Sequence, residues 1–297
     1  MRIFITGASG WIGSAAVDEL ISEGHEVHGL ARSDASAARL DAKGAHVLRG
    51  DLDDLDSLRR GAVESDAVLH LANKHDWANP AESNRAERAA VETLAEALAG
   101  SGKTFALASG LLSPDGLRPV LESDPSPATG PESMRGGTEN LAFEYIERGV
   151  RSIALRFSPT VHGVGDHGFI SQIVAAARRT GVSGYVGEGD NAWAAVHRPD
   201  AARLVRLALE QAPAGTRVHA VAEEGVSTRA IAEAVADALG VTTTSIDPAD
   251  AVQHFGFIGR FFGAQMRASS AATRAEFGWT PTGPTLVEDI ANGAYTS

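Results

Sequence analysis

The feature that most constrains this chain is a glycine-spaced turn at its start. Residues 2–6 read as a short buried strand of β-branched and aromatic residues, and Gly7, Gly10 and Gly13 follow at three-residue spacing. An amphipathic helix is expected next, over about residues 11–23. A strand that turns at glycine and restarts as a helix leaves backbone N–H groups and the positive end of a helix dipole facing outward. Such a turn suits a pyrophosphate.

The position of these glycines says more than their spacing. They follow a strand and open a helix, and a second strand is expected over residues 25–31. This context predicts the first βαβ unit of a dinucleotide-binding domain, although three glycines alone can simply form a turn. The first glycine permits the tight turn, the second lets the backbone approach the phosphate, and the third lets the helix lie close to its strand. The residues of the turn expected to bind the cofactor are Thr6, Gly7, Ser9, Gly10, Trp11, Ile12 and Gly13.

The end of the second strand favours NADP over NAD. An acidic residue at this position hydrogen-bonds the adenosine ribose and selects NAD. Here the strand ends Gly29-Leu-Ala-Arg-Ser33, with alanine where the acid would stand. The guanidinium of Arg32 suits a 2′-phosphate, and Ser33 can donate a further hydrogen bond. If the strand ended earlier, Arg32 would instead be a solvated surface residue.

Two later strand ends supply further cofactor candidates. The third strand is followed by Asp51 and Leu52, and the Asp51 carboxylate is expected to accept from the adenine amino group or, alternatively, to cap the next turn. The fourth strand, residues 66–72, ends at Leu71 and Ala72. Small side chains at this strand end would leave room for the cofactor.

Composition excludes several classes of protein. The 297 residues contain no cysteine, which excludes disulfides, thiolate metal sites and a cysteine nucleophile. The net charge of −12 argues against nucleic acid and anionic membrane as partners. No stretch approaches 18 uninterrupted apolar residues, and the chain starts with a strand rather than a signal peptide. A soluble, cytoplasmic protein without a membrane partner is expected.

Several of these motifs together resemble the extended short-chain dehydrogenase/reductase superfamily, and within it the NAD-dependent epimerase/dehydratase-like proteins. The motifs are Thr6-Gly-Ala-Ser-Gly-Trp-Ile-Gly13, Gly50-Asp51-Leu52, the end of the fourth strand, Ser109, Leu155-Arg-Phe-Ser-Pro-Thr-Val-His-Gly163 and Ala194-Ala-Val-His-Arg-Pro-Asp-Ala201. Phe157, in the fifth of these motifs, joins the cofactor-binding candidates. The resemblance extends along nearly the whole chain.

The resemblance implies an α/β fold with a doubly wound parallel sheet (Rossmann-type) and a smaller C-terminal substrate-binding lobe. The dinucleotide-binding domain is expected over residues 1–165 plus about 192–225, and the lobe over about 166–191 plus 226–297. The active cleft is expected between them. Helices are predicted over residues 169–179 in the lobe and 228–239 after the last core strand.

The chain differs from this family at the residues that transfer the substrate proton. The family resembled uses Tyr-x-x-x-Lys, in which the tyrosine transfers a proton and the lysine lowers its pKa and holds the nicotinamide ribose. The helix expected to carry this motif, about residues 132–147, lacks it. Counting from Glu139 places Arg135 at the lysine position and Pro131 at the tyrosine position. Arg135 could hold a ribose or phosphate but is too basic to act as an acid, and it could equally be a solvated helix arginine.

Other residues are therefore candidates for the catalytic groups. His75 follows the fourth strand and His162 the sixth, at strand ends where such sites open, and imidazole titrates near neutral pH. Tyr185 could enter from the substrate-binding part, and Ser109 could be the family's hydroxyl group or lie one residue before it. Each has a structural alternative, such as a hydrogen bond within a loop.

No metal site is predicted. The combination of His162, Asp166 and His167 is conceivable, but the glycines around it favour a loop that covers the cofactor. The predicted function is an NADP(H)-dependent oxidoreductase that transfers hydride to or from a small carbonyl or alcohol. A sugar-nucleotide epimerase or dehydratase and a non-catalytic NADP-sensing regulator are the alternatives. The predicted partner is a small-molecule substrate, and the protein is expected to be a monomer or homodimer.

Overall fold

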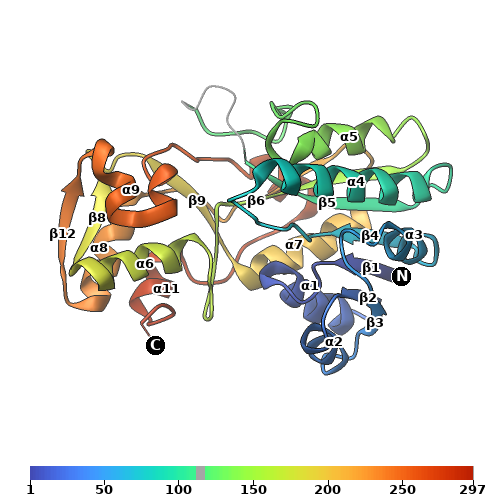
Figure 1. The fold of residues 1–297 in the computed structure, drawn as a ribbon, viewed down its shortest axis with the longest axis horizontal. Helices are drawn as coiled ribbons and strands as arrows, with labels where there is room; N and C mark the ends of the chain where they lie inside the picture. Colours follow the sequence, from blue (N-terminus) through green and yellow to red (C-terminus); the bar gives the residue numbers. More distant parts are fainter. Residues whose placement is uncertain (112–117, 297) are drawn as a thin grey trace. The chain divides into compact units, whose positions relative to one another are not determined.

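The computed structural model describes residues 1–111 and 118–296 and contains two compact units (Figure 1). The first unit comprises Met1–Ser109, Pro125–Arg156 and Ala202–Val218, and the second comprises Gly110–Asp124, Phe157–Ala201 and His219–Ser297. These units divide the chain at different residues from the predicted domains. The predicted division of labour, with cofactor binding in one part and substrate binding in the other, stays a prediction.

A seven-stranded sheet, built mainly from the first unit, has the strand order β10-β6-β5-β4-β1-β2-β3. Four of its strand pairs, β1–β2, β1–β4, β2–β3 and β4–β5, are parallel. The chain moves outward from β1 to β3 and then returns to β4 on the other side of β1, which is the reversal of a doubly wound sheet. The predicted fold class is confirmed. The strands are β1 (Arg2–Thr6), β2 (Glu26–Ala31), β3 (His46–Arg49), β4 (Ala67–His70), β5 (Thr104–Gly110), β6 (Arg151–Phe157) and β10 (Arg217–Ala220).

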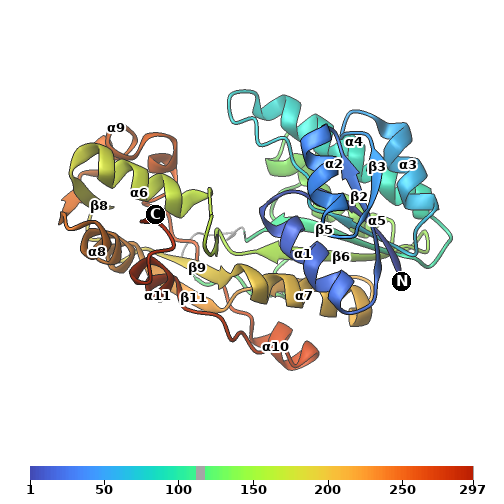
Figure 2. The same cartoon turned by 90° about the horizontal axis from the view of Figure 1, so that it is seen from below.

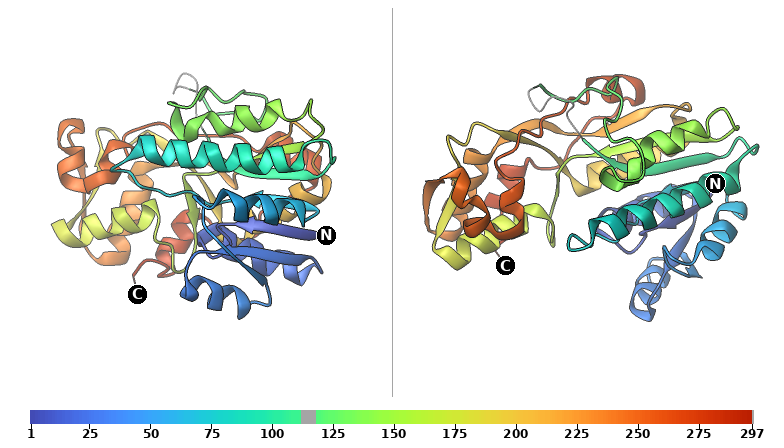
Figure 3. Two further views of the ribbon diagram at one scale, coloured as in Figure 1. Left: turned by 45° about the vertical axis from the view of Figure 1, so that its right-hand side comes forward. Right: turned by 45° about the horizontal axis from the view of Figure 1, so that its top comes forward.

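Helices cover both faces of this sheet. On one face, α3, α4 and α5 bury an apolar cluster against Phe4, Val68 and Phe105, and α4 and α5 run side by side (Figure 3). On the other face α1 lies beside α7, where Glu19 pairs with Arg206 at 2.8 Å (Figure 2). The helices are α1 (Trp11–Ser22), α2 (Asp34–Asp41), α3 (Leu55–Val63), α4 (Pro80–Leu98), α5 (Thr138–Glu144) and α7 (Arg198–Gln211).

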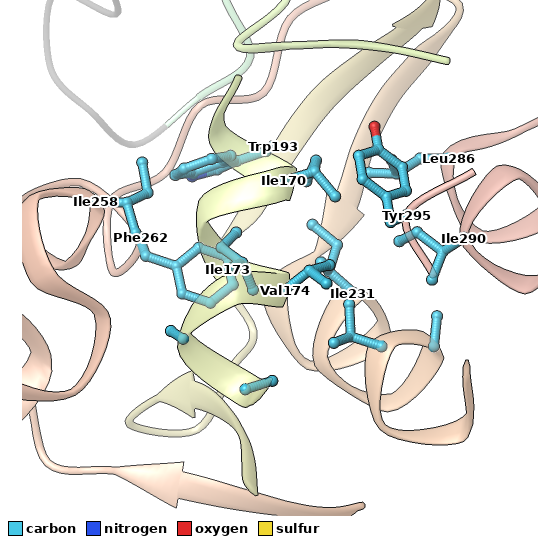
Figure 4. Packing of buried hydrophobic residues seen from close by; sticks show 14 of the residues in the cluster. Ile170, Ile173, Val174, Trp193, Ile231, Ile258, Phe262, Leu286, Ile290 and Tyr295 are labelled. Atoms are coloured by element: carbon cyan, nitrogen blue, oxygen red, sulfur yellow. The ribbon is translucent and has the colours of Figure 1, made fainter. Parts of the chain in front are cut away.

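The second unit has its own core. Trp193 is fully buried there, packs edge-on against Phe262 and donates its indole N–H to the carbonyl of Ala264 at 3.1 Å (Figure 4). Around it lie a three-stranded sheet in the order β11-β9-β7 and a parallel pair of β12 and β8. The strands are β7 (Thr160–His162), β8 (Val182–Val186), β9 (Ala192–His197), β11 (Glu223–Ser227) and β12 (Thr242–Ile246). The helices are α6 (Phe169–Thr180), α8 (Thr228–Leu239), α9 (Ala251–Phe255), α10 (Ala271–Phe277) and α11 (Leu286–Ala291).

The helix predicted over residues 132–147 is wrong in its extent. The helix α5 starts only at Thr138, after a short 3₁₀ turn, Met134–Gly137. Within that turn Arg135, Gly136 and Gly137 have φ values of 54°, 63° and 65°. Left-handed residues cannot continue a right-handed helix, and two adjacent glycines adopt this conformation at little cost. Arg135 therefore lies in a strained turn and not on a helix.

None of the helices in the described part of the chain combines the length and apolarity that a membrane crossing requires.

We expect Gly13→Ala to destabilise the protein, although alanine has the higher helix propensity of the two residues. Alanine is ordinarily favoured over glycine inside a helix. At Gly13, however, an added Cβ would lie 2.1 Å from the carbonyl oxygen of Gly7, so the turn must open. Overpacking of this kind costs roughly 1–3 kcal/mol. Urea unfolding followed by circular dichroism measures the change, with Ser14→Ala as the neighbouring control. An unchanged or higher unfolding free energy for Gly13→Ala would contradict the close packing of α1 on its turn.

Candidate active site

The first glycine turn is held against the end of β4. Gly7 has a φ of 72°, and a Cβ there would lie 2.7 Å from the amide nitrogen of Ala72 and 2.8 Å from the carbonyl carbon of Leu71. The Thr6 hydroxyl also accepts a hydrogen bond from the Ala72 amide at 3.3 Å. Leu71 and Ala72, two of the predicted cofactor residues, are therefore next to the turn because Gly7 lacks a side chain.

The first turn of α1 has no side-chain cap. Gly10 is its N-cap residue, and no acidic residue follows in the first turn. The first amides of this twelve-residue helix thus keep the positive end of the dipole available to an anion. Gly10 is exposed, whereas Ser9, Trp11 and Ile12 are half-buried beside it. A Cβ at Gly10 would lie 3.1 Å from the Gly7 carbonyl oxygen, a tight contact that a small adjustment relieves.

One arginine lies at the end of each of the neighbouring strands β2 and β3. The strand β2 ends at Ala31, as predicted, and the exposed Arg32 has no hydrogen bond or ion pair with any described residue. Ser33 is the N-cap of α2, where its hydroxyl accepts from the Ser36 amide. Arg49 on β3 is in register with Ala31 and pairs with Asp34 at 2.7 Å. Arg49 is therefore already engaged, and Arg32 is the arginine left to meet a phosphate.

Asp51 and Leu52 have local structural roles. One carboxylate oxygen of Asp51 accepts from the amides of Asp53, at 2.9 Å, and Asp54, at 3.1 Å. This is the turn-capping alternative, and it leads the chain into α3. Leu52 packs on the apolar cluster beneath α3 and α4. The adenine role of Asp51 stays a prediction.

A buried carboxylate organises the region after β4. Glu87 on α4 is 1% exposed, and its two oxygens bind the Arg135 guanidinium at 2.5 Å and the Asn73 amide at 2.9 Å. His70, the last residue of β4, lies 3.7 Å away. Burial alone would raise the pKa of the Glu87 carboxyl, but Arg135, His70 and Asn73 outweigh it and lower the pKa to about 2. The group is therefore a permanent anion that fixes Arg135.

The same network reaches His75 and the glycine turn. The backbone N–H of His75 donates to the Asn73 side-chain oxygen at 2.8 Å, so Asn73 connects His75 to Glu87. On the other side, His70 Nδ1 lies 2.8 Å from the Thr6 hydroxyl. One chain of polar contacts thus runs from the cofactor turn to His75.

His75 and Arg135 share a further property. Within residues 1–111 and 118–296 they are the two non-glycine residues with positive φ, at 50° and 54°. Such conformations cluster at functional sites, where the surroundings hold the strain. Partial desolvation, and then the charge of Arg135, lower the pKa of the His75 imidazole, although the Glu87 charge opposes them. The Nε of Arg135 is buried and has no hydrogen-bond partner among the described residues.

Ser109 is bound to a second buried carboxylate. Its hydroxyl donates to Glu139 at 2.6 Å, and Glu139 also accepts from Arg156, at 2.5 Å and 3.0 Å, and from Arg217 at 3.1 Å. Burial would raise the pKa of Glu139, but Arg156, Ser109 and Arg217 lower it. Sequence reasoning used Glu139 only to set the register and missed the two arginines. The catalytic role of Ser109 stays a prediction.

The remaining candidates belong to the second unit. His162 is 1% exposed, and its Nδ1 lies 2.7 Å from Asp289; burial lowers the pKa of this imidazole in spite of the carboxylate. Tyr185 on β8 lies under Arg229, whose guanidinium carbon is 4.8 Å from the ring centre. Phe157 is buried at the end of β6. Their predicted site roles stay predictions.

Sequence reasoning did not find His70, Asn73 or Glu87. His70 carried a signal, since it is a polar residue inside an otherwise apolar strand. Glu87 carried another, since it lies on the apolar face of α4 with Ala90, Val91 and Leu94. Neither signal predicts which residue His70 or Glu87 contacts, because these contacts join segments that are distant in sequence.

A doubly wound sheet with a glycine turn and an uncapped helix start is the arrangement of a dinucleotide-binding protein. The family model of the NAD dependent epimerase/dehydratase family matches residues 3–221. The chain belongs to this family, and the predicted resemblance is confirmed.

Individual proteins agree with this assignment. An uncharacterized protein of Saccharomyces cerevisiae is 44% identical over 98% of both chains. A 4-hydroxy-2-methyl-3-oxo-4-farnesyl-3,4-dihydroquinoline-1-oxide ketoreductase of Stigmatella aurantiaca is 28% identical, over 72% of this chain and 66% of its own. Among solved structures, dTDP-glucose 4,6-dehydratase from Streptomyces venezuelae with NAD and TYD bound is similar in fold. Its TM-score is 0.78 at 21% identity, over 99% of this chain and 96% of that one.

The residues of the first unit fit a nicotinamide dinucleotide. The missing side chain at Gly7 keeps the turn tight, and the start of α1 offers free amides to a pyrophosphate. The buried Nε of Arg135, unpaired within the described residues, is a donor available to a polar ligand.

We expect Gly10→Val to weaken NADPH binding by about 10–100-fold while the protein stays folded. The φ and ψ of Gly10, −78° and −177°, are accessible to valine, so the fold tolerates the side chain. Its methyl groups would cover the first amides of α1, and hydrogen bonds to a charged group contribute roughly 1.5–3 kcal/mol each. Fluorescence titration with NADPH measures the loss, and Ala42→Val is an exposed control outside the turn. Undiminished binding in folded Gly10→Val would contradict the assignment of the turn.

Proposed function

We propose that the protein is an NADP(H)-dependent oxidoreductase that transfers hydride between the coenzyme and a small carbonyl or alcohol, with His75 as the proton-transfer residue. The observation that carries the proposal is the pairing of the two strained residues, His75 and Arg135, through the Asn73–Glu87 network. Strain is maintained only where the surroundings over-determine it. The Asn73–Glu87 network fixes the backbone of His75 after β4, and the His75 imidazole would supply the titrating group that the family motif otherwise provides.

In carbonyl reduction the coenzyme supplies hydride to the carbonyl carbon. The protonated His75 donates its proton to the carbonyl oxygen, which gives the alcohol and leaves a neutral imidazole. In the reverse direction the neutral imidazole takes the hydroxyl proton as hydride leaves the carbon. The Arg135 guanidinium would hydrogen-bond the bound ligands through its Nε.

The preference for NADP rests on Arg32, Ser33 and the lack of an acid at the end of β2. Arg32 is exposed and unpaired within the described chain, so a 2′-phosphate would not have to displace a carboxylate from it. Arg49 beside it is already paired with Asp34.

The ketoreductase from Stigmatella aurantiaca favours carbonyl reduction over sugar-nucleotide epimerisation, because it shares sequence over most of this chain. The similarity to a sugar-nucleotide dehydratase supports the fold alone. A cytoplasmic location and a monomeric or dimeric state stay predictions of the sequence.

We expect Arg32→Ala to weaken NADPH binding by about 10–100-fold and to leave NADH binding nearly unchanged. A charge-assisted hydrogen bond to phosphate contributes roughly 1.5–3 kcal/mol, and NADH lacks that phosphate. Calorimetric titration of both coenzymes measures the two affinities. Arg49→Ala is the matched control, because Arg49 lies at the end of the adjacent strand. If Arg32→Ala lowered the affinities for NADPH and NADH equally, Arg32 would not recognise the 2′-phosphate, and the argument for NADP would fail.

We expect His75→Asn to lower kcat by about 10²–10⁴-fold, the usual contribution of a general acid or base, without loss of NADPH affinity. Asparagine tolerates the positive φ of His75, so the backbone is kept. In the native protein kcat/KM for reduction should rise as pH falls through the pKa of His75, which lies below its ordinary value of 6.5, and kcat/KM for oxidation should fall. In His75→Asn, kcat/KM should no longer change with pH in this range, either for reduction or for oxidation.

NADPH oxidation against a panel of carbonyl compounds, repeated from pH 5 to 9, makes these measurements. His167→Asn removes an exposed histidine of the second unit and is the control. Unchanged turnover in His75→Asn would refute its role. Tight NADPH binding by the native protein with no turnover on any carbonyl or alcohol would support the regulator instead.

A further inference from the structure

Three metal-ligating side chains meet on β2 and β3, away from the candidate active site. Residues two apart on a strand share a face, which places Glu26 and His28 of β2 together. The strands β2 and β3 lie side by side (Figure 1), and their parallel register pairs His28 with His46, the first residue of β3. The three side chains thus converge across two adjacent strands. Arg32 and the glycine turn lie at the carboxyl ends of the strands, whereas Glu26 and His46 are the first residues of theirs.

The ligand atoms are close to metal-binding geometry. Glu26 Oε1 lies 2.6 Å from His28 Nε2 and 3.9 Å from His46 Nε2, and the three ligand atoms all fall within 4.8 Å of one another. The imidazole rings are 4.8 Å apart between centroids. Tetrahedral zinc with bonds of about 2.0–2.2 Å requires ligand atoms about 3.3–3.5 Å apart. The side chains of His46 and Glu26 are 66% and 42% exposed, so small rotations reach that spacing.

The set of donors selects the kind of metal. Two imidazoles and one carboxylate suit zinc and similar transition metals, whereas calcium and magnesium prefer all-oxygen sites. We propose that Glu26, His28 and His46 form a binding site for a divalent transition metal ion of the zinc type, with water in the fourth position. Arg2 opposes it, because its Nε lies 3.1 Å from the same Glu26 oxygen. Both side chains of this pair are half-exposed, and a surface ion pair of this kind contributes little, so a metal ion can displace it.

The site would act on the edge of the sheet. The strand β3 is the last strand in the order and has only four residues. A metal held by His46 of β3 and by Glu26 and His28 of β2 joins this short edge strand to its neighbour. Its effect is therefore expected on stability, and it requires no part of the proposed hydride transfer.

Sequence analysis predicted no metal because it considered residues close in sequence, His162, Asp166 and His167. The new site depends on the register between two strands. Among the described residues, Glu26, His28 and His46 are the one group of three or more such side chains that meets this spacing.

Calorimetric titration of the full chain with zinc chloride, after dialysis against a chelator, tests the proposal. One zinc ion per chain should bind, and the melting temperature should rise. His28→Ala or His46→Ala should weaken zinc binding by more than the roughly 10–100-fold that loss of an outer partner costs. Both variants should also lose the rise in melting temperature on addition of zinc. Glu26→Gln should weaken zinc binding too.

His167→Ala is the matched control, because it removes an exposed histidine from the alternative cluster. It should bind zinc as the native chain does. The proposal is overturned if the native chain binds no zinc, or if His28→Ala and His46→Ala bind it as tightly as His167→Ala. Visible absorption of the cobalt-loaded protein provides a second readout of the site, since a low-coordinate site absorbs strongly and the two histidine variants should lose that signal.

Discussion

The hydrogen bonds and ion pairs of the buried Glu87 carboxylate hold together the segments around the cofactor turn. A charge in this position is stable only with its partners, and removal of one partner from a buried ion pair costs about 3–5 kcal/mol. Those partners come from the end of β4, the loop that follows it and the turn before α5. One side chain therefore fixes three segments that the chain order separates. Helix α4 brings this anion to all three because Glu87 faces inward among alanine, valine and leucine.

The same carboxylate also holds Arg135, the residue that the sequence predicts at the lysine position of the family motif. Positive φ values at non-glycine residues cost roughly 1–3 kcal/mol each, and the Glu87 ion pair offsets such a cost at Arg135. Gly136 and Gly137 let the chain leave this turn and enter α5 without a clash of side chains. The turn thus keeps a cation beside the site although the helix that would carry the lysine is shortened.

Local patterns were enough to predict much of the fold. The β1 strand, the glycine turn, the end of β2 at Ala31 and the helices α6 and α8 follow from hydrophobic period and from glycine, and all are present. The helix over residues 132–147, expected from the family resemblance, was wrong in its extent, since Arg135, Gly136 and Gly137 adopt positive φ values that a right-handed helix cannot contain. The glycine turn of the candidate site could also be predicted. The Glu87 network could not, because its partners meet only after β4, α4 and the turn before α5 have packed together.

Replacing a phenol by an imidazole changes the direction in which a proton-transfer site works best. An unperturbed tyrosine hydroxyl is neutral across the physiological range and can donate, whereas imidazole donates only after it has taken up a proton. In the proposed mechanism, partial desolvation and then the charge of Arg135 lower the pKa of His75, which favours the neutral, proton-accepting form and with it alcohol oxidation. Glu87 limits this effect, because its charge compensates that of Arg135 and raises the pKa of His75. Through Asn73 the buried anion therefore fixes the backbone at His75, and its charge raises the pKa of the imidazole proposed to transfer the proton.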